Sequence, residues 1–316
     1  MSMLIKSKTD LNIMRPVGFH KNMNLNLKKA ISRVDKKCGW KKVYRCPICS
    51  SNKKKLFLVK FKQNIFECQK CFTGYIEFVP KNFDVLYNDQ EQYLHHQKSY
   101  EKTRKYRIKR FGKERLKLLQ QFKKKGNLID IGCGNGWFLE SVKDHYNVHG
   151  LEMNSSLAKF TSQKLSINVF ENYTKIQKNF YDIITLFDVI EHVEKPFDYI
   201  AYLGKFLKKN GIILIFTPNK KSVAFLCMRE DQNLICPPFH VTYLQKESFS
   251  FIPKSFKMIF SQTRGLDIGD ILAFERDNKK EILNSEQDIN ENLNKQNEID
   301  FLGLGNHIRI VIKKIK

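Results

Sequence analysis

The sequence lacks any long apolar run. No stretch of 18 consecutive apolar residues occurs, which argues against a transmembrane helix. Residues 1–21 are interrupted by charge every few positions and contain no apolar core of a signal peptide. We therefore expect the chain to stay in the cytoplasm, without a membrane span.

Acidic residues are scarce in the N-terminal part only. Residues 1–125 carry 32 Lys and Arg against 9 Asp and Glu, whereas residues 126–316 carry 24 against 23. The net charge of +24 therefore comes almost entirely from the first part of the chain. Such a basic segment attracts anionic partners, either nucleic acid or a small acceptor that bears negative charge.

A disulfide framework is also absent, although the chain has eight cysteines. Four of them form two C-x-x-C pairs separated by 18 residues, and such pairs in a chain without a secretion signal are typical of metal ligands. Four thiolates complete a tetrahedral Zn²⁺ site with no open position, so the predicted role of the zinc is structural. The predicted ligands are Cys46, Cys49, Cys68 and Cys71. The isolated cysteines, expected to be buried thiols, are Cys38, Cys133, Cys227 and Cys236.

The patterns along the chain predict four parts. Residues 1–43 form a basic lead-in with no firm period, residues 44–80 a zinc ribbon with a short hairpin, and residues 81–125 a basic helical linker, helical over 91–125. Residues 126–316 alternate strands with helices, which predicts a Rossmann-like α/β sheet with helices on both faces. A polar, mobile insertion is expected at about 276–300. The predicted strands of the sheet are 127–131, 147–151, 168–170, 181–187, 211–216 and 307–312, and the predicted helices are 136–145, 155–165 and 197–208.

The strongest chemical signal is a glycine-rich turn between a predicted strand and a predicted helix. The strand 127–131 runs into Gly132, Gly134 and Gly136, and glycines let the backbone approach a ligand closely. Glu152 stands twenty residues after Gly132, at the end of the next predicted strand. A carboxylate in that place can accept hydrogen bonds from both hydroxyls of a ribose, which predicts an adenosine-containing cofactor.

The spacing of the turn separates two kinds of cofactor. Dinucleotide folds use G-x-G-x-x-G to hold pyrophosphate at a helix N-terminus. Here the pattern is Asp130-x-Gly132-x-Gly134-x-Gly136, and an acid before the turn suits a cationic amino acid tail and a sulfonium better. At this point the chain resembles the class I methyltransferases, whose first motif reads D-x-G-C-G-x-G.

This resemblance covers roughly residues 110–316. It continues through residues 187–193, which look like the family's motif after the fourth strand, and through residues 207–211 and 217–219 around the fifth. The resemblance implies S-adenosyl-L-methionine as cofactor. The residues that it places at the cofactor are Asp130, Gly132, Gly134, Gly136, Glu152, Phe187 and Asp188. Helix capping is an alternative role for Asp188.

A zinc module ahead of this pattern resembles a family of bacterial methyltransferases with an N-terminal zinc ribbon. That resemblance implies an acceptor among the sugars or nucleotide-linked sugars of surface polysaccharides and antibiotics. A tyrosine-rich stretch with Tyr87, Tyr93 and Tyr100, and the segment 262–268, are similar to segments of those relatives. The basic N-terminal part would then help attract an anionic, diphosphate-bearing acceptor.

Two histidines are candidates for the general base that removes the acceptor's proton. His240 lies where the related enzymes carry a histidine before an aromatic segment, and His192 follows Glu191 at the expected start of a helix beside the cofactor. Deoxysugar C-methyltransferases carry Y-x-E-H at the former position. Pro237 and Phe239 replace the Tyr and Glu here, which favours an O- or N-acceptor. A structural role for either histidine is the alternative.

RNA is the alternative acceptor. The ribbon and the basic helix would then bind phosphates while ribbon aromatics stack on bases, although those rings also suit a small hydrophobic core. The aromatics are Phe57, Phe61, Phe66 and Phe72. The chain lacks an N-P-P-Y or D-P-P-Y motif and the cysteine motif of C5 chemistry, which disfavours base methylation by those routes. A third hypothesis, a binding module on a degenerate methyltransferase fold, is disfavoured by the intact glycine turn.

Overall fold

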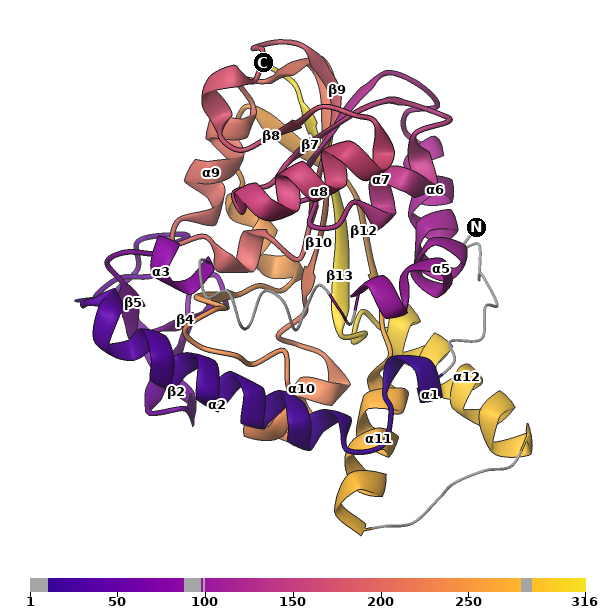
Figure 1. The fold of residues 1–316 in the computed structure, drawn as a ribbon. Coiled ribbons are helices and arrows are strands. Elements are labelled where there is room, and N and C mark those ends of the chain that lie inside the picture. The colour runs from indigo at the N-terminus through magenta and orange to yellow at the C-terminus, as the bar shows by residue number, and fades with distance from the viewer. Residues whose placement is uncertain (1–10, 88–97, 99, 280–285) are drawn as a thin grey trace.

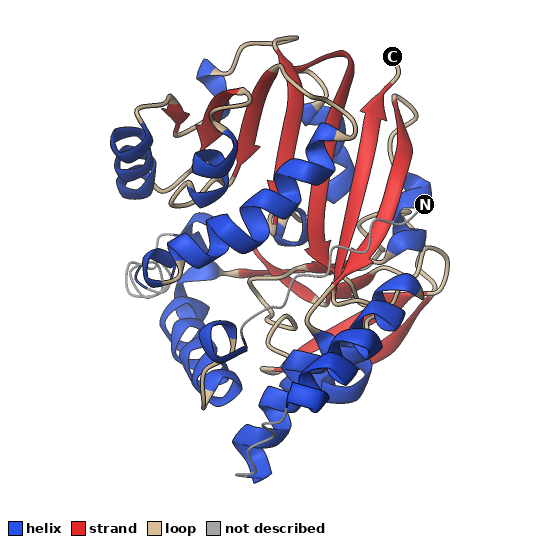
Figure 2. Ribbon diagram, turned by 90° about the vertical axis from the view of Figure 1, so that its right-hand side faces the viewer, coloured by secondary structure: helices blue, strands red, loops and turns tan. Residues whose placement is uncertain are grey.

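A seven-stranded sheet forms the centre of the molecule, in the order β12-β13-β10-β9-β6-β7-β8 (Figures 1 and 2). The structure is a computed structural model that describes residues 11–87, 98, 100–279 and 286–316. Neighbouring strands from β10 to β8 are parallel, and β13 runs antiparallel to both β10 and β12. The strands are β6 (Asn127–Ile131), β7 (Asn147–Leu151), β8 (Val169–Phe170), β9 (Tyr181–Phe187), β10 (Leu207–Pro218), β12 (Phe256–Arg264) and β13 (His307–Lys314). The predicted fold class is confirmed.

Two hydrophobic cores lie on opposite faces of this sheet. Ile184 of β9 belongs to the core that packs against α9 (Pro196–Leu203). Its neighbour Ile183 belongs to the core that packs against α6 (Lys113–Gln120) and α7 (Trp137–Val142). Because successive residues of a strand point to opposite faces, a strand covered on both sides is apolar throughout rather than alternating. A continuous apolar run such as residues 212–216 of β10 is therefore the sequence signature of this sheet.

The basic lead-in contains a helix that the sequence prediction lacks. α2 (Phe19–Cys38) has 20 residues, and among its buried side chains are Leu27, Ala30 and Cys38. These pack with Phe239, which lies far along the chain in the loop after β10. The buried and half-buried side chains recur every three or four residues, at 20, 23, 27, 30 and 31, so α2 is amphipathic and the packing of this face stabilises it. A preceding short helix is α1 (Leu11–Met14).

The helix predicted over residues 91–125 is interrupted near its middle. α5 (Arg104–Arg107) leads into a π-helical turn, η1 (Ile108–Gly112), and then into α6. Glycine is needed at 112 because a Cβ there would lie 2.6 Å from Ser141 Cβ on α7. Residues 91–97 of the prediction, with Tyr93, lie outside the described residues. Single π-helical turns are rare and occur frequently at functional sites.

Three further sequence predictions differ from the structure or are refined by it. The helix predicted over 197–208 is too long, because Leu207 already pairs with Tyr181 at the start of β10. The polar segment predicted at 276–300 is largely helical, within α11 (Asp267–Lys279) and α12 (Glu286–Phe301). Cys227 is exposed rather than buried, unlike the other three isolated cysteines. Its helix, α10 (Val223–Met228), buries Ala224, Phe225 and Met228 instead.

A second sheet, in the order β11-β4-β3-β2, contains the cysteine module. The predicted hairpin is formed by β2 (Lys54–Lys60) and β3 (Gln63–Cys68), and β4 (Gly74–Ile76) follows. The fourth strand, β11 (Thr242–Tyr243), comes from the loop after β10 and pairs antiparallel with β4. The ribbon and the methyltransferase-like part therefore share one sheet. Smaller elements nearby are β1 (Trp40–Lys42), β5 (Phe78–Pro80), α3 (Asp84–Tyr87) and the 3₁₀ segment η5 (Lys246–Phe251).

Among the described residues, no helix combines the length and the apolar character that crossing a bilayer requires.

A buried hydroxyl pair provides a test of the junction between the two sheets. Thr73 Oγ1 donates to Ser248 Oγ at 2.8 Å, and both side chains are fully buried. We expect Ser248→Ala to lower the free energy of unfolding by about 1–3 kcal/mol, because Thr73 would lose a buried partner. Ser250→Ala is the matched control, exposed on the same η5 segment, and should change it by less than about 0.5 kcal/mol. Urea unfolding curves that shift equally for the two variants would contradict this account.

Candidate active site

The glycine turn and the end of β9 meet where the strand order reverses. β6 has β7 on one side and β9 on the other. In open α/β sheets, ligands bind beyond the carboxyl ends of the strands at such a switch point. A cavity of about 1690 Å³ opens at this place. Small-molecule pockets usually measure roughly 300–1,000 Å³, so this cavity has room for two ligands at once.

The turn after β6 depends on its glycines at two positions. Gly134 has a φ of 54°, and an added Cβ would meet no atom within 4 Å, so the backbone stands open there. Gly136 has a φ of 73°, and a Cβ would lie 2.5 Å from Thr161 on α8 (Ser155–Leu165). Residues with side chains resist such positive φ values. The turn can therefore bring backbone atoms close to a ligand while it packs tightly on α8.

Glu152 is fixed beside this turn. Its carboxylate accepts hydrogen bonds from the backbone N–H groups of Gly134 and Asn154, each at 3.0 Å. It lines the cavity, and burial raises its pKa although the backbone donors oppose the rise. A carboxylate has about four lone-pair positions, so two donors leave acceptor capacity for a ligand's hydroxyls.

Some of the remaining predicted cofactor residues line the cavity, and the others lie behind its wall. Gly132 and Asp188 line the cavity. Asp130 lies beneath the turn, where it is buried and accepts a hydrogen bond from Thr185 Oγ1 at 2.6 Å. Burial raises its pKa to about 7. The predicted residues that support the wall without lining it are Asp130, Gly134, Gly136 and Phe187.

Asp188 directly follows β9 and lines the cavity. Its φ is 57°, in the left-handed region that Asp adopts more readily than most other non-glycine residues. His307 Nε2 lies 3.3 Å from Asp188 Oδ1. Burial would raise the pKa of Asp188, but the hydrogen bond and charge of His307, with the charge of Arg115, lower it to about 2. The cavity therefore keeps a carboxylate at this point of its wall.

Arg115 is a site residue that the sequence did not single out. Its guanidinium lies over the rings of Phe187, Trp137 and Phe216, at 4.0, 4.7 and 5.0 Å from their centroids. Burial lowers its pKa to about 10, and it forms no ion pair with a described residue. A cation on the cavity wall without a carboxylate partner is suited to an anionic group of a ligand. No pattern in the sequence distinguishes Arg115 from the many other basic residues of the linker.

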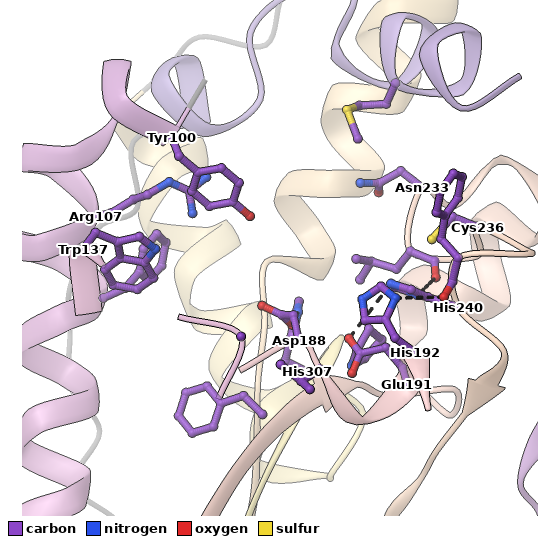
Figure 3. A pocket seen from close by; sticks show the side chains of 18 of the residues that line it. Tyr100, Arg107, Trp137, Asp188, Glu191, His192, Asn233, Cys236, His240 and His307 are labelled. Carbon is purple, nitrogen blue, oxygen red and sulfur yellow. Dashed lines mark hydrogen bonds and ion pairs between the residues drawn. The ribbon is translucent and has the colours of Figure 1, made fainter. Parts of the chain in front are cut away.

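The two predicted histidines lie together in the same cavity, 4.7 Å apart between ring centroids (Figure 3). His192 Nδ1 is 2.8 Å from Phe239 O, and His240 Nδ1 is 2.8 Å from Leu234 O. Nδ1 must donate to a carbonyl oxygen, so Nε2 of each neutral ring is the acceptor. The expectation that His192 opens a helix is wrong: it ends a short 3₁₀ turn, η3 (Ile190–His192), before α9.

Glu191 completes this group. Its Oε2 accepts the Thr217 hydroxyl at 2.9 Å, and its buried Oε1 has no hydrogen-bond partner. Oε1 lies 4.0 Å from His240 Nε2. Burial and the charge of Asp188 raise the pKa of Glu191, and burial with the charge of His192 lowers the pKa of His240 to about 3. The ligand atoms of Glu191 and both histidines lie within 4.8 Å of one another, so the group can hold a proton or a metal cation.

Aromatic and basic side chains form the opposite wall of the cavity. In Figure 3, Tyr100, Arg107 and Trp137 face the histidine group across the space, with Asp188 and His307 between the two groups. The Arg107 guanidinium lies 4.1 Å from the centroid of the Tyr100 ring. Tyr100 belongs to the tyrosine-rich stretch that is similar to a segment of the zinc-ribbon methyltransferases, and it lines the cavity.

The cysteine module holds the loop that carries His240. Val241 N–H donates to Glu191 O at 2.9 Å, and Val241 O accepts from Ile76 N–H at 3.2 Å. The next two residues form β11 against β4. The backbone after His240 is therefore bonded on one side to η3 and on the other to the ribbon sheet.

The four predicted zinc ligands gather at one point. Cys46 Sγ lies 3.4 Å from Cys71 Sγ, and Cys49 Sγ lies 3.5 Å from Cys68 Sγ. All four sulfurs lie within 4.8 Å of one another. Both C-x-x-C turns are built alike: the N–H of the residue four after the first cysteine donates to that cysteine's carbonyl, at Ser50 and Phe72. The geometry matches two knuckles around a tetrahedral metal ion.

Comparisons with known proteins agree with this architecture. A family model described as a methyltransferase domain matches residues 100–268. The chain is 32% identical over 121 residues to a ubiquinone biosynthesis O-methyltransferase of Rickettsia typhi, a match that covers 36% of this chain and 49% of that protein. A mitochondrial protein of the same name from Dictyostelium discoideum is 34% identical over 121 residues, covering 32% and 37%.

A solved structure of a SAM-dependent methyltransferase from Archaeoglobus fulgidus has 22% identity and a TM-score of 0.46, and covers 68% of this chain and 99% of that one. The chain belongs to the family of methyltransferase domains, with the Rossmann-like fold of the class I S-adenosylmethionine-dependent enzymes. It spans about half the length or less of these two curated relatives.

Glu152 provides a direct test of the cofactor end of the cavity. We expect Glu152→Ala to weaken S-adenosylhomocysteine binding by about 1–3 kcal/mol, because hydrogen bonds to the ribose hydroxyls are lost. The control is Glu171→Ala, which removes an exposed carboxylate near the end of β8. Isothermal titration measures both affinities. Equal affinity of Glu152→Ala and the unaltered protein would refute the assignment of Glu152.

Proposed function

We propose that the chain transfers the methyl group of S-adenosyl-L-methionine to an oxygen atom of a small-molecule acceptor. One observation carries the proposal: a single cavity is lined at one end by Gly132 and Glu152 and at the other by His192 and His240. The family membership supports the cofactor, and the names of the relatives support an oxygen acceptor. The departure from Y-x-E-H at Pro237 and Phe239 favours O- or N-transfer in the same way.

The residues at the cofactor end fit this cofactor. Glu152 would accept hydrogen bonds from the ribose hydroxyls, and the backbone at Gly132, which lines the cavity, would lie against the amino acid portion. Arg115 would pair with the carboxylate of that portion, and the ionised Asp188 would face its ammonium group. The bound cofactor supplies an electrophilic methyl group on a sulfonium. The protein's task is then to orient the acceptor and remove its proton.

His240 is the proposed general base. Its Nδ1 contacts Leu234 O, so Nε2 is a free acceptor on the cavity wall. The low pKa keeps the ring neutral before reaction, and proton uptake would require that the bound acceptor raises this pKa toward neutral. Glu191 Oε1 has no hydrogen-bond partner among the described residues and lies 4.0 Å from Nε2, so a Glu191 that ionises as His240 takes up the proton would stabilise the imidazolium. His192 contacts the carbonyl of Phe239 and so positions the loop next to His240.

The ribbon aromatics favour a small acceptor over RNA. Phe57, Phe61 and Phe66 pack against three of the hydrophobic clusters, and Phe72, 44% exposed, is the one left for stacking on a base. The histidine group is buried in the cavity instead of lying on an open surface. Within the small-molecule class, the zinc-ribbon resemblance favours a sugar or nucleotide-linked sugar, whereas the relatives' names point to ubiquinone biosynthesis.

Zinc is the metal that we propose for the four cysteines. Four thiolates at tetrahedral spacing leave no open coordination position, so the ion would be structural and would take no part in methyl transfer. Its role would be to stabilise β2, β3 and β4, and with them β11 and the loop of His240.

The base assignment predicts separate effects on turnover and on cofactor binding. His240→Ala should lower turnover by about 10²–10⁴-fold while S-adenosylhomocysteine affinity stays unchanged, because His240 lies at the acceptor end. His145→Ala, an exposed histidine outside the cavity, is the control. Release of S-adenosylhomocysteine can be followed with a panel of sugars, nucleotide-linked sugars and phenols as acceptors. Wild-type turnover in His240→Ala would assign the base elsewhere.

A further inference from the structure

Three arginines surround a single buried carboxylate on the cavity wall. Glu114 of α6 lies 2.5 Å from Arg309 Nη1 and 3.6 Å from Arg264 Nε, and it also forms an ion pair with Arg110. Each of the three arginine side chains is at most 14% exposed. All four residues line the cavity that contains the cofactor and histidine groups.

Counted over the described residues, the positive charges of this cluster exceed the negative ones. The arginines lower the pKa of Glu114 to about 2 against the effect of burial, so it carries one full negative charge. Asp300 also pairs with the cluster, 3.4 Å from Arg264 Nη1. Burial raises the pKa of Asp300 to about 7, so it is partly neutral at neutral pH. Buried charge without full compensation is costly, which points to an anion from outside the chain.

Two donor atoms of the cluster have no acceptor in the part of the chain that the structure describes. These are the buried Nε of Arg110 and Nε of Arg309. Arg110 lies in the π-helical turn η1, and turns of this kind occur frequently at functional sites. Arg264 pairs with His307 in the β12–β13 register, two residues from Arg309 on β13. Residues two apart point to the same face, so Arg264 and Arg309 present their guanidinium groups on one face of the sheet.

We propose that Arg110, Arg264 and Arg309 bind a phosphate group of the acceptor. The proposal rests on the proposed methyl transfer and narrows its substrate class to phosphate-bearing small molecules, nucleotide-linked sugars among them. A terminal phosphate carries a charge of about −1.5 to −2, and the diphosphate of a nucleotide-linked sugar carries about −1 on each phosphate, so either compensates the excess better than a single carboxylate would. Planar guanidinium groups bind phosphate oxygens through two parallel hydrogen bonds.

This anion site is separate from the one proposed for the cofactor's carboxylate. The ring of Phe216 lies 4.7 Å from the Arg309 guanidinium and 5.0 Å from that of Arg115. Arg115 contacts the aromatic residues beside the glycine turn, whereas Arg309 belongs to the Glu114 cluster. Cofactor and acceptor phosphate would therefore lie on either side of one aromatic ring.

The test is titration of inorganic phosphate and pyrophosphate into the full chain saturated with S-adenosylhomocysteine, with acetate as a carboxylate probe. Both phosphates should bind, acetate should bind more weakly, and Arg110→Gln should weaken pyrophosphate binding by about tenfold or more. Lys109→Gln is the matched control, exposed on the same π-helical turn, and should leave the affinity unchanged. If Arg110→Gln does not fold, Arg110→Lys is the second variant. It keeps the positive charge but loses the planar guanidinium that forms two parallel hydrogen bonds, so it should still weaken binding.

Three results would overturn the proposal. The first is no phosphate binding at millimolar concentration, which would leave the cluster as a clamp between α6 and the sheet. The second is phosphate binding that S-adenosylhomocysteine abolishes, which would assign the arginines to the cofactor. The third is equal affinity in Arg110→Gln and Lys109→Gln. If S-adenosylhomocysteine itself does not bind, the proposed function fails, and titration of the free protein still tests the arginine site.

Discussion

The peptide group of Val241 links the two sheets of the molecule. Its N–H bonds to Glu191 O and its carbonyl to Ile76 N–H, so one residue joins the η3 turn after β9 to the ribbon sheet. His240 precedes it directly, and β11 follows it. The position of the proposed base therefore depends on a module that ends more than 150 residues earlier in the sequence. The pairing of β11 with β4 adds to the contacts of His192 with Phe239 O and of His240 with Leu234 O in holding this loop.

The cavity wall is organised by charge as well as by shape. Carboxylates at Glu152 and Asp188 lie at the glycine turn and the end of β9, where a ribose and a cationic group would bind. Arg115 and the cluster around Glu114 provide positive charge on the side of α6. In the sequence, the basic linker predicts a general attraction for anions. In the structure, it places a few arginines at defined positions beside aromatic rings. Its surplus charge acts locally within an enclosed space.

Sequence patterns located the segments in which residue type and spacing coincide within a few residues. The structure places the turn at Gly132–Gly136 and Glu152 beside the cavity and brings the two cysteine pairs together, while their functions stay predictions. The apolar strands were found because both faces of the sheet are covered. Arg115 and Glu191 were not singled out, since their roles arise from long-range packing against aromatic rings and against His240. The same holds for β11, whose partner β4 lies elsewhere in the chain. The helical period of α2 is present in the sequence but was missed among the Lys and Asn residues of this segment.

Hydrogen–deuterium exchange before and after chelation of the proposed zinc tests the link between the cysteine module and the loop of His240 most directly. The account predicts that chelation speeds amide exchange at least about tenfold in residues 63–76 and, together with them, in residues 240–244, because β11 loses its pairing with β4. Amides of residues 147–151, in β7 of the main sheet, should stay protected. Loss of protection in residues 63–76 with unchanged exchange in residues 240–244 would contradict the claim that the cysteine module holds the loop of His240.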